Sequence, residues 1–291
     1  MIVTCREMKE IEERAFAAGA SAEALMESAG GQMAAQIRAF FPAPGICHVF
    51  FGKGHNGGDA LAAARCLARE GWRLQWHPVF PREELAPLTR QKLSEAEQAA
   101  EAFAALPAGP HRIVLDGLLG LGAKPGLREP VRSAAAAING LRQRGATVFA
   151  LDLPTGLDGD TGAAGPGAVV ADCTLAVGFA KRGLLADGAL DFVGRLAVLP
   201  LAEFAAPAEA GALETVATPR ALAKLVPPRR YGTHKGDCGR VGIVAGSRGF
   251  AGAAVMASQA AVRAGAGLVS LFVTPDRKST RLNSSHRTVS R

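Results

Sequence analysis

The sequence of 291 residues has few cysteines, and they show no pattern that would form disulfides or bind a metal. The five cysteines are widely separated, odd in number and include no C-x-x-C pair: Cys5, Cys47, Cys66, Cys173 and Cys238. Disulfide-stabilised small domains and thiolate zinc sites use closely spaced cysteines. The cysteine usage therefore argues against both classes and predicts a reducing, cytoplasmic compartment.

Long apolar runs are also missing. A membrane-spanning helix needs about 20 consecutive apolar residues, and no stretch of this sequence approaches that length. The first ten residues carry several charges and lack the apolar core of a secretory signal. With 48% hydrophobic and 20% charged residues, the composition is that of a globular protein with one large domain or two smaller ones. We expect no membrane association.

Acidic residues are scarce at the C-terminal end, and this scarcity accounts for the formal net charge of +7. Residues 215–291 contain thirteen basic and two acidic residues, whereas residues 1–214 have a net charge of −4. The last fifteen residues, 277–291, hold five basic residues, no acid and no periodicity. Because no aromatic or structured basic surface accompanies them, we expect a non-native tail here and no nucleic-acid partner.

The body of the sequence alternates short apolar runs with helical segments. Thr4 with Glu7 forms the pattern of a capping box, and Ser21 begins a second helix that runs to about residue 41. Strands are expected at 47–51, 74–80, 112–116, 147–151, 173–177 and 195–199, and helices at 59–70, 82–104 and 128–144. Such β-α-β units predict an α/β fold, a Rossmann-like three-layer sandwich with a mainly parallel sheet.

The second half of the chain differs in pattern. Residues 203–219 are rich in Ala, Pro and Glu, and a strand, a helix and a strand follow at 240–245, 253–264 and 268–273. One β-α-β unit cannot bury both faces of its sheet. The sequence therefore predicts a first domain over 1–205, a linker over 206–219, and an incomplete second domain over 220–276, before the tail.

A glycine-rich loop lies between the first central strand and its helix: Gly52-Lys53-Gly54-His55-Asn56-Gly57-Gly58-Asp59. Glycines allow a tight turn, and the N-terminus of the helix that follows attracts phosphate. The loop satisfies G-x-G-x-x-G, but the next strand lacks the acid that binds a ribose hydroxyl, since no acid lies between Arg73 and Glu83. Two interpretations of this loop remain open. It binds a ligand other than an ordinary dinucleotide cofactor, or it is a turn without any ligand.

Polar residues also follow the other expected strands. Asp116 and Asp152 each end a strand, and Lys124 and Thr155 lie in the loops beyond. The carboxyl ends of parallel strands form a ligand crevice, so we expect these residues to converge with Asn56. Oxygen atoms of Asn56, Asp116 and Thr155 suit a hard cation, and Lys124 with Asp152 suits proton transfer. The spacing of these residues alone establishes neither the cation site nor the proton-transfer pair. Each residue also suits a local turn or helix cap.

Four ordered motifs resemble the NAD(P)H-hydrate epimerase domain: Leu25-Met26-Glu27-Ser28-Ala29-Gly30, the loop 52–59, Asp116-Gly-Leu-Leu-Gly-Leu-Gly122 and Asp152-Leu-Pro-Thr-Gly156. The stretch 234–269 is similar to the start of the ADP/ATP-dependent NAD(P)H-hydrate dehydratase domain, which has a ribokinase-like fold. The whole chain thus resembles the family of bifunctional NAD(P)H-hydrate repair enzymes.

The resemblance implies metabolite repair, the interconversion of the R and S epimers of NADHX or NADPHX. It implies a potassium ion held by Asn56, Asp116 and Thr155, and an acid–base pair of Lys124 and Asp152. Substrate contacts are expected at His55, Asn56, Gly57, Gly58, Asp59, Gly120, Leu121, Gly122, Ala123, Lys124, Pro125, Gly126 and Asp152. A homo-oligomer is compatible with the sequence.

Some positions depart from the family pattern. His55 replaces a usual Asn, Ala60 a frequent Gly, Leu121 a Thr, and Thr155 a Ser. Thr155 keeps the hydroxyl that a cation site needs, whereas His55 and Leu121 change the expected substrate contacts. The Gly-Thr-Gly-Asp segment of the dehydratase does not occur in these residues. We therefore expect no dehydratase activity, and ADP or ATP as a ligand only with a complete dehydratase domain.

Two other functions remain open. The glycine pattern alone also fits an NAD-dependent oxidoreductase, which would use ordinary NAD(P)H on a carbonyl substrate. The departures at His55 and Leu121 favour a non-catalytic dinucleotide-binding module on the same fold. The three hypotheses differ in whether a bound dinucleotide is epimerised, oxidised or merely held.

Overall fold

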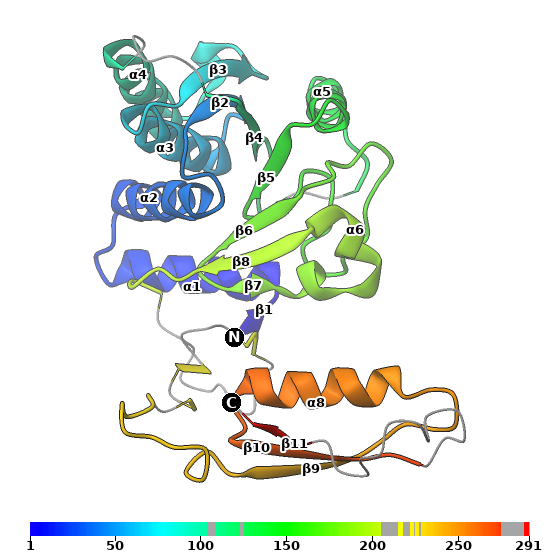
Figure 1. The fold of residues 1–291 in the computed structure, drawn as a ribbon. Coiled ribbons are helices and arrows are strands. Elements are labelled where there is room, and N and C mark those ends of the chain that lie inside the picture. Colours follow the sequence, from blue (N-terminus) through cyan, green and yellow to red (C-terminus); the bar gives the residue numbers. More distant parts are fainter. Residues whose placement is uncertain are drawn as a thin grey trace. The chain divides into compact units, whose positions relative to one another are not determined.

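The computed structural model (Figure 1) describes residues 1–103, 109–122, 125–204, 215–217, 222–223, 225–226, 228–274 and 288–290. The chain divides into two compact units, residues 1–216 and residues 217–291. The domain boundaries expected at 205/206 and 219/220 fall outside the described residues. They therefore stay predictions.

The first unit contains a six-stranded sheet in the order β3-β2-β4-β5-β6-β8. Its strands are β2 (Gly45–Phe51), β3 (Arg73–Pro78), β4 (His111–Gly117), β5 (Thr147–Leu151), β6 (Cys173–Val177) and β8 (Arg195–Leu199). Every neighbouring pair is parallel, which confirms the predicted fold class. A separate short parallel pair joins β1 (Ile2–Val3) to β7 (Ala180–Lys181).

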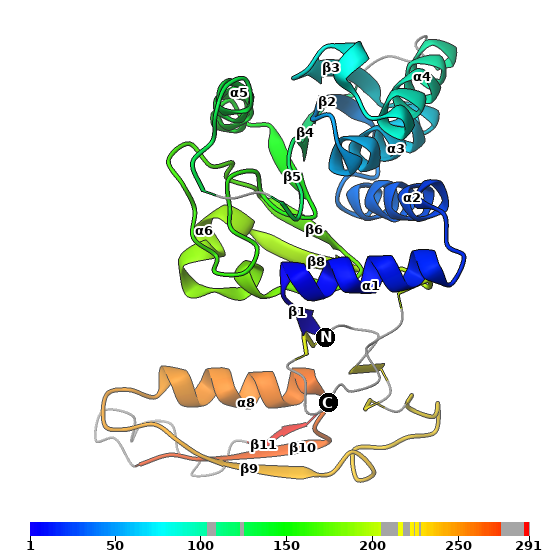
Figure 2. The same ribbon diagram turned by 180° about the vertical axis from the view of Figure 1, so that it is seen from behind.

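Helices cover both faces of this sheet. They are α1 (Cys5–Ala17), α2 (Ala22–Phe40), α3 (His55–Arg69), α4 (Pro87–Ala102), α5 (Val131–Gln143) and the short α6 (Leu190–Val193), with 3-10 turns η1 (Arg82–Glu84), η2 (Arg182–Leu185) and η3 (Asp187–Ala189). The core of α1, α2 and α3 packs on one face, and α5 packs on the other with Val114 and Val148 (Figures 1 and 2). None of the described helices is long and apolar enough to cross a membrane.

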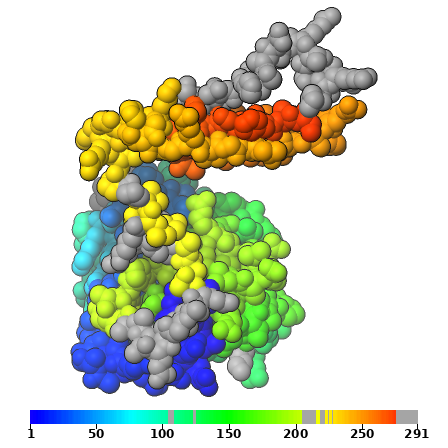
Figure 3. Space-filling model, turned by 90° about the horizontal axis from the view of Figure 1, so that it is seen from below, coloured from blue at the N-terminus to red at the C-terminus, as the bar shows by residue number. Residues whose placement is uncertain are grey.

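The two leading helices begin at the residues that the sequence predicts. The backbone N–H of Glu7 donates to Thr4 Oγ1 at 3.1 Å, while the Thr4 N–H donates to the Glu7 carboxylate at 2.6 Å. Ser21 Oγ accepts from the N–H of Ala24 at 3.1 Å at the start of α2. On the surface, the N-terminal helices adjoin the end of β8 (Figure 3), where Gln32 donates to the Pro200 carbonyl at 2.9 Å. Both predicted caps are confirmed.

Two helices begin four or more residues from their predicted starts. The helix expected from residue 59 begins at His55, because the glycines of the loop form its first turn instead of preceding it. A Cβ at Gly57 would collide with the carbonyl oxygen of Gly52, so this close approach admits only glycine despite its low helix propensity. The helix expected over 82–104 begins at Pro87, which occupies the first helical position that proline tolerates.

Helices α2 and α3 approach closely at Gly30, and this contact yields a stability prediction. A Cβ at Gly30 would lie 2.6 Å from the Cβ of Ala62, whereas a Cβ at Gly31 would meet nothing within 4 Å. We expect Gly30→Ala to lower the free energy of unfolding by about 1–3 kcal/mol through overpacking. The neighbouring Gly31→Ala should instead raise it by about 0.5–1 kcal/mol, because alanine favours helix.

Urea denaturation of both variants measures the difference. Equal effects at Gly30 and Gly31 would show that the α2–α3 contact does not constrain the backbone, and would contradict this prediction.

The second unit holds the predicted strand, helix and strand, with bounds within two residues of those expected: β9 (Arg240–Val244), α8 (Gly252–Ala264) and β10 (Leu268–Phe272). Strand β10 pairs in parallel with β9 and antiparallel with β11 (Thr288–Ser290). Among the described residues of this unit, only Ala254, Ser258, Gly267 and Val269 are buried. Its core is therefore small.

Candidate functional site

A cavity of about 460 Å³ lies at the carboxyl ends of the central strands. It is lined by the loop after β2, the loop after β4, and residues at the ends of β5 and β6. The chain runs from β2 to β3 on one side of the sheet and then continues from β4 to β8 on the other. The cavity therefore lies at the point where the strand order reverses, which is the usual ligand position of open parallel sheets.

The cavity brings together many of the predicted substrate residues: His55, Asn56, Asp59, Gly120, Leu121, Gly122 and Asp152. Gly57 and Gly58 are buried beside it in the first turn of α3. Pro125 and Gly126 are exposed and do not line it. Ala123 and Lys124 lie outside the described residues, so the predicted role of Lys124 in proton transfer stays a prediction.

Asp116 is fully buried at the end of β4 and binds Thr155. The Thr155 hydroxyl donates to Asp116 Oδ1 at 2.7 Å, and the Thr155 N–H donates to Oδ2 at 2.8 Å. The N–H of Leu118 donates to Oδ1 at 3.3 Å. Burial raises the pKa of the Asp116 carboxyl to about 6, against the opposing effect of these hydrogen bonds.

Asn56 joins this pair through the peptide of Leu119. Its amide Nδ2 donates to the Leu119 carbonyl at 2.7 Å, and the Leu119 N–H donates to Thr155 Oγ1 at 3.3 Å. The other amide atom, Asn56 Oδ1, is buried and has no hydrogen-bond partner among the described residues. An unsatisfied buried acceptor costs about 1–3 kcal/mol, which a cation would relieve.

The oxygen atoms of Asn56, Asp116 and Thr155 are the donor types that a hard cation prefers. In the described part of the chain, no three His, Cys, Asp or Glu side chains are placed to hold a metal ion together. The residues therefore fit a hard monovalent or divalent cation, and the unpaired Asn56 Oδ1 is the observation that supports it.

Asp152 lies in a strained backbone conformation at the rim of the cavity. Its φ angle of 66° falls in the left-handed region, where a residue other than glycine is uncommon. Its Oδ1 accepts from the N–H of Val177 at 3.1 Å and from the ammonium of Lys181. Sequence reasoning missed Lys181, the last residue of the short strand β7, because no local signal places that strand beside the site.

Asp59 also faces the cavity, but it has no hydrogen bond or ion pair among the described residues. Burial raises the pKa of its carboxyl well above the usual value; the charges of Asp152 and Glu12 raise it further, and Lys181 opposes them. Burial likewise raises the pKa of Glu12, which α1 brings to the same cavity. Nothing in the sequence distinguished Glu12 from the other charges of that helix.

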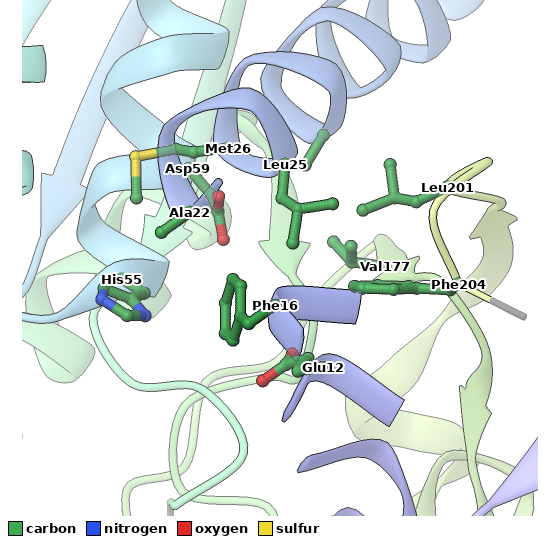
Figure 4. A pocket seen from close by; sticks show the side chains of 11 residues that line it. Glu12, Phe16, Ala22, Leu25, Met26, His55, Asp59, Val177, Leu201 and Phe204 are labelled. Atoms are coloured by element: carbon green, nitrogen blue, oxygen red, sulfur yellow. The ribbon is translucent and has the colours of Figure 1, made fainter. Parts of the chain in front are cut away.

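A smaller cavity of about 70 Å³ adjoins the first (Figure 4). The two share Glu12, His55, Asp59 and Val177. Figure 4 shows Phe16 beside the carboxyls of Glu12 and Asp59, with apolar side chains completing the wall: Leu25, Val177, Leu201 and Phe204. These apolar side chains contribute to the burial that raises the pKa of Asp59.

Asp59→Asn is expected to stabilise the protein. The folded-state pKa of Asp59 lies above its unfolded value of about 3.9, and each unit of that difference costs about 1.4 kcal/mol at neutral pH. The wild type therefore has its full stability below about pH 4 and loses part of it as the pH rises, whereas asparagine does not titrate.

Urea denaturation should show the largest gain from Asp59→Asn near pH 7 and almost none near pH 4. A variant that is less stable than the wild type at pH 7 would show that an ionised Asp59 has a favourable partner.

A parallel sheet with a glycine-rich helix start and a cavity at its switch point defines an α/β domain of the doubly wound class. More specifically, the chain belongs to the family described as YjeF-related protein N-terminus, which matches residues 22–183. A second profile, described as NAD(P)H-hydrate dehydratase, matches residues 241–289.

Curated relatives and a solved structure agree with this membership. The chain is 36% identical to the bifunctional NAD(P)H-hydrate repair enzyme Nnr of Gloeobacter violaceus, over 97% of this chain and 57% of that protein. It is 37% identical to the enzyme of the same name from Pyrobaculum aerophilum, over 91% of this chain and 53% of that protein. The chain thus spans about half the length of these relatives.

The crystal structure of yeast ynu0, YNL200c, supports the fold alone. It is 21% identical in sequence and superimposes with a TM-score of 0.55, covering 63% of this chain and 82% of the yeast chain.

Proposed function

We propose that the first unit is a metabolite-repair enzyme that interconverts the R and S epimers of NAD(P)H hydrate. The observation that carries the proposal is the pair of carboxyl groups in the cavity: Asp152 has a cationic partner, and Asp59 has none among the residues that the structure describes. Carboxyl groups whose environments differ in this way perform different steps in acid–base chemistry. Membership of the YjeF-related family and the names of the relatives support the same function.

Epimerisation at C6 of the hydrated ring takes place at a carbon that bears a hydroxyl and the ring nitrogen. In the proposed step an acceptor takes the hydroxyl proton as the bond from C6 to the ring nitrogen breaks, which leaves a carbonyl at C6, and a donor protonates the nitrogen. Attack of the nitrogen on the other face of the carbonyl reverses both proton transfers and gives the other epimer, so no external electron carrier is needed. Asp152 is the proposed acceptor, because its carboxylate lines the cavity and is paired with Lys181. Lys124 is its proposed partner in proton transfer, as the family resemblance implies. Asp59, whose carboxyl pKa burial raises, is the proposed hydrogen-bond partner of the substrate.

The diphosphate of the substrate binds at the start of α3 in this proposal. The first residues of that helix have no side-chain cap and no acid in the first turn, so their N–H groups are available to an anion. Lys9 and Lys53 line the same cavity and add positive charge. The absence of a ribose-binding acid agrees with a dinucleotide that is bound as a substrate. KM values measured separately for NADHX and NADPHX determine which of the two binds better.

Potassium is the proposed ion of the oxygen cluster, with Asn56, Asp116 and Thr155 as its protein ligands. When bound it would supply a fixed positive charge beside the substrate loop. Asn56 Oδ1, which has no protein partner among the described residues, is the atom that most favours this assignment.

A reducing, cytoplasmic location is likewise proposed, supported by five cysteines that are all free.

The second unit is proposed to lack dehydratase activity in this polypeptide. Its match to the dehydratase covers residues 241–289, and the Gly-Thr-Gly-Asp segment named above is not in the printed sequence. Incubation with the S epimer and ADP or ATP should regenerate no NAD(P)H. Regeneration above the rate without protein would overturn this part of the proposal.

A coupled assay tests the proposed function against its rivals. The R epimer of NADPHX is incubated with this protein and an intact dehydratase that consumes only the S epimer, and the expected result is NADPH formation at a rate that depends on the concentration of this protein. Binding of the R epimer without faster conversion would favour the non-catalytic module. Oxidation of ordinary NADPH with a carbonyl compound would favour the oxidoreductase.

A further inference from the structure

Lys181 is a buried cation at the edge of the candidate site. It is the last residue of β7, and only 1% of its surface is exposed. Its ammonium donates to Asp152 Oδ1 and, at 2.8 Å, to the carbonyl oxygen of Val177. A buried ion pair is commonly no more stable than apolar side chains of the same size, so stability alone does not explain a lysine here.

The contacts of Asp152 leave one of its oxygens for the cavity. Oδ1 accepts from both the Val177 N–H and Lys181, whereas no described residue donates to Oδ2. Because Lys181 and Val177 hold the same oxygen, the carboxylate cannot rotate without breaking two hydrogen bonds. The left-handed backbone of Asp152, at φ 66°, is also held in place by these contacts.

Lys181 also offsets a concentration of negative charge. Glu12, Asp59 and Asp152 all line the cavity, and the charge of Lys181 opposes the rise in the pKa of Glu12 and of Asp59. Lys9 and Lys53 line the same cavity but are exposed to solvent, so their charges are more strongly screened than that of Lys181.

We propose that Lys181 is a positioning residue for the proposed epimerisation: it fixes the Asp152 carboxylate so that Oδ2 points to the substrate as the proton acceptor. Lys181 itself touches no substrate and exchanges no proton in this scheme. The inference rests on the proposed function, because it assigns Lys181 a role only through Asp152.

The test measures kcat and KM for R-to-S conversion of NADPHX. Lys181→Met, which keeps the length of the side chain without its charge, should lower kcat about 10–100-fold, the effect of misplacing a catalytic group, and leave KM within about twofold. Lys181→Ala should recover part of its kcat when ethylammonium chloride is added at constant KCl, and none with the same concentration of NaCl. If Lys181 only stabilised the fold, its replacement would not lower kcat while leaving KM nearly unchanged.

A double-mutant cycle shows whether Lys181 acts through Asp152. In the Asp152→Asn background, Lys181→Met should cause no further loss of kcat, because the carboxylate that it positions is already gone. The double variant also removes both buried charges together, so it should fold even if one of the single variants does not.

The matched control is Lys92→Met. Lys92 is a second buried lysine, bound to Glu23, Glu27 and Glu95 at 2.8, 2.6 and 3.0 Å, but it does not line the cavity. Its replacement should lower the stability and leave kcat unchanged.

The outcomes separate the inference from the proposed function. If the wild type does not convert the epimers, the proposed function fails. If the wild type is active and Asp152→Asn is not, but Lys181→Met keeps kcat within twofold, Lys181 has no positioning role. Fully additive losses in the cycle would also overturn the inference.

Discussion

Asp152→Asn is expected to lower kcat for epimerisation by about 10²–10⁴-fold, the usual contribution of a positioned acid or base. Asparagine keeps the shape of the side chain and its contact with the Val177 N–H, but it cannot take a proton at Oδ2. KM should change little, because the proposed substrate contacts also include the loops after β2 and β4, which line most of the cavity. Epimerisation rates at several substrate concentrations measure both constants.

The same substitution should also destabilise the protein. It leaves the Lys181 ammonium buried without its counter-charge, which costs about 3–5 kcal/mol in comparable pairs. Circular dichroism at the assay temperature must therefore confirm that the variant is folded. The exposed Asp191→Asn serves as the control and should leave both kcat and stability unchanged. An Asp152→Asn enzyme with more than half of the wild-type kcat would remove Asp152 from the mechanism.

Asp116→Ala is expected to have the largest effect on stability. The carboxylate is fully buried and accepts three hydrogen bonds, two from Thr155 and one from Leu118. Its removal leaves three donors unsatisfied and a small void, for a total cost of about 4–5 kcal/mol in the free energy of unfolding. Urea denaturation with and without KCl measures this loss, and KCl should stabilise the wild type but not the variant.

Thr155→Ser is the matched control for this prediction. Serine keeps the hydroxyl that donates to Asp116 Oδ1, so both the stability and the effect of KCl should be close to those of the wild type. If Asp116→Ala were as stable as the wild type, the hydrogen bonds around Asp116 would not organise the site. Equal stabilisation of Asp116→Ala and wild type by KCl would remove Asp116 from the cation site.

The architecture of the sheet could be predicted from the sequence because its strands are apolar and short. Strands β5, β6 and β8 have the expected bounds, since residues such as Val148 and Leu175 lie in uninterrupted apolar runs. The start of α3 could not be predicted. The glycines of the loop suggest a turn in isolation, and only the close approach of Gly57 to Gly52 makes them the first turn of a helix.

Part of the candidate site could also be predicted from the sequence. Polar residues at strand ends identified Asp116 and Asp152, because parallel strands end at one edge of a sheet. Lys181 and Glu12 belong to β7 and α1, whose positions at that edge depend on packing between distant segments. The missing partner of Asp59 is also a tertiary property, since no local sequence signal reports that a carboxyl group lacks a counter-charge.

The most direct test of the central claim starts from each purified epimer of NADPHX separately and follows the R and S forms by chromatography, without any dehydratase. The account predicts that the protein accelerates both directions to the same final ratio, and that Asp152→Asn slows both directions equally. Two epimers that interconvert no faster with the protein than without it would contradict the account.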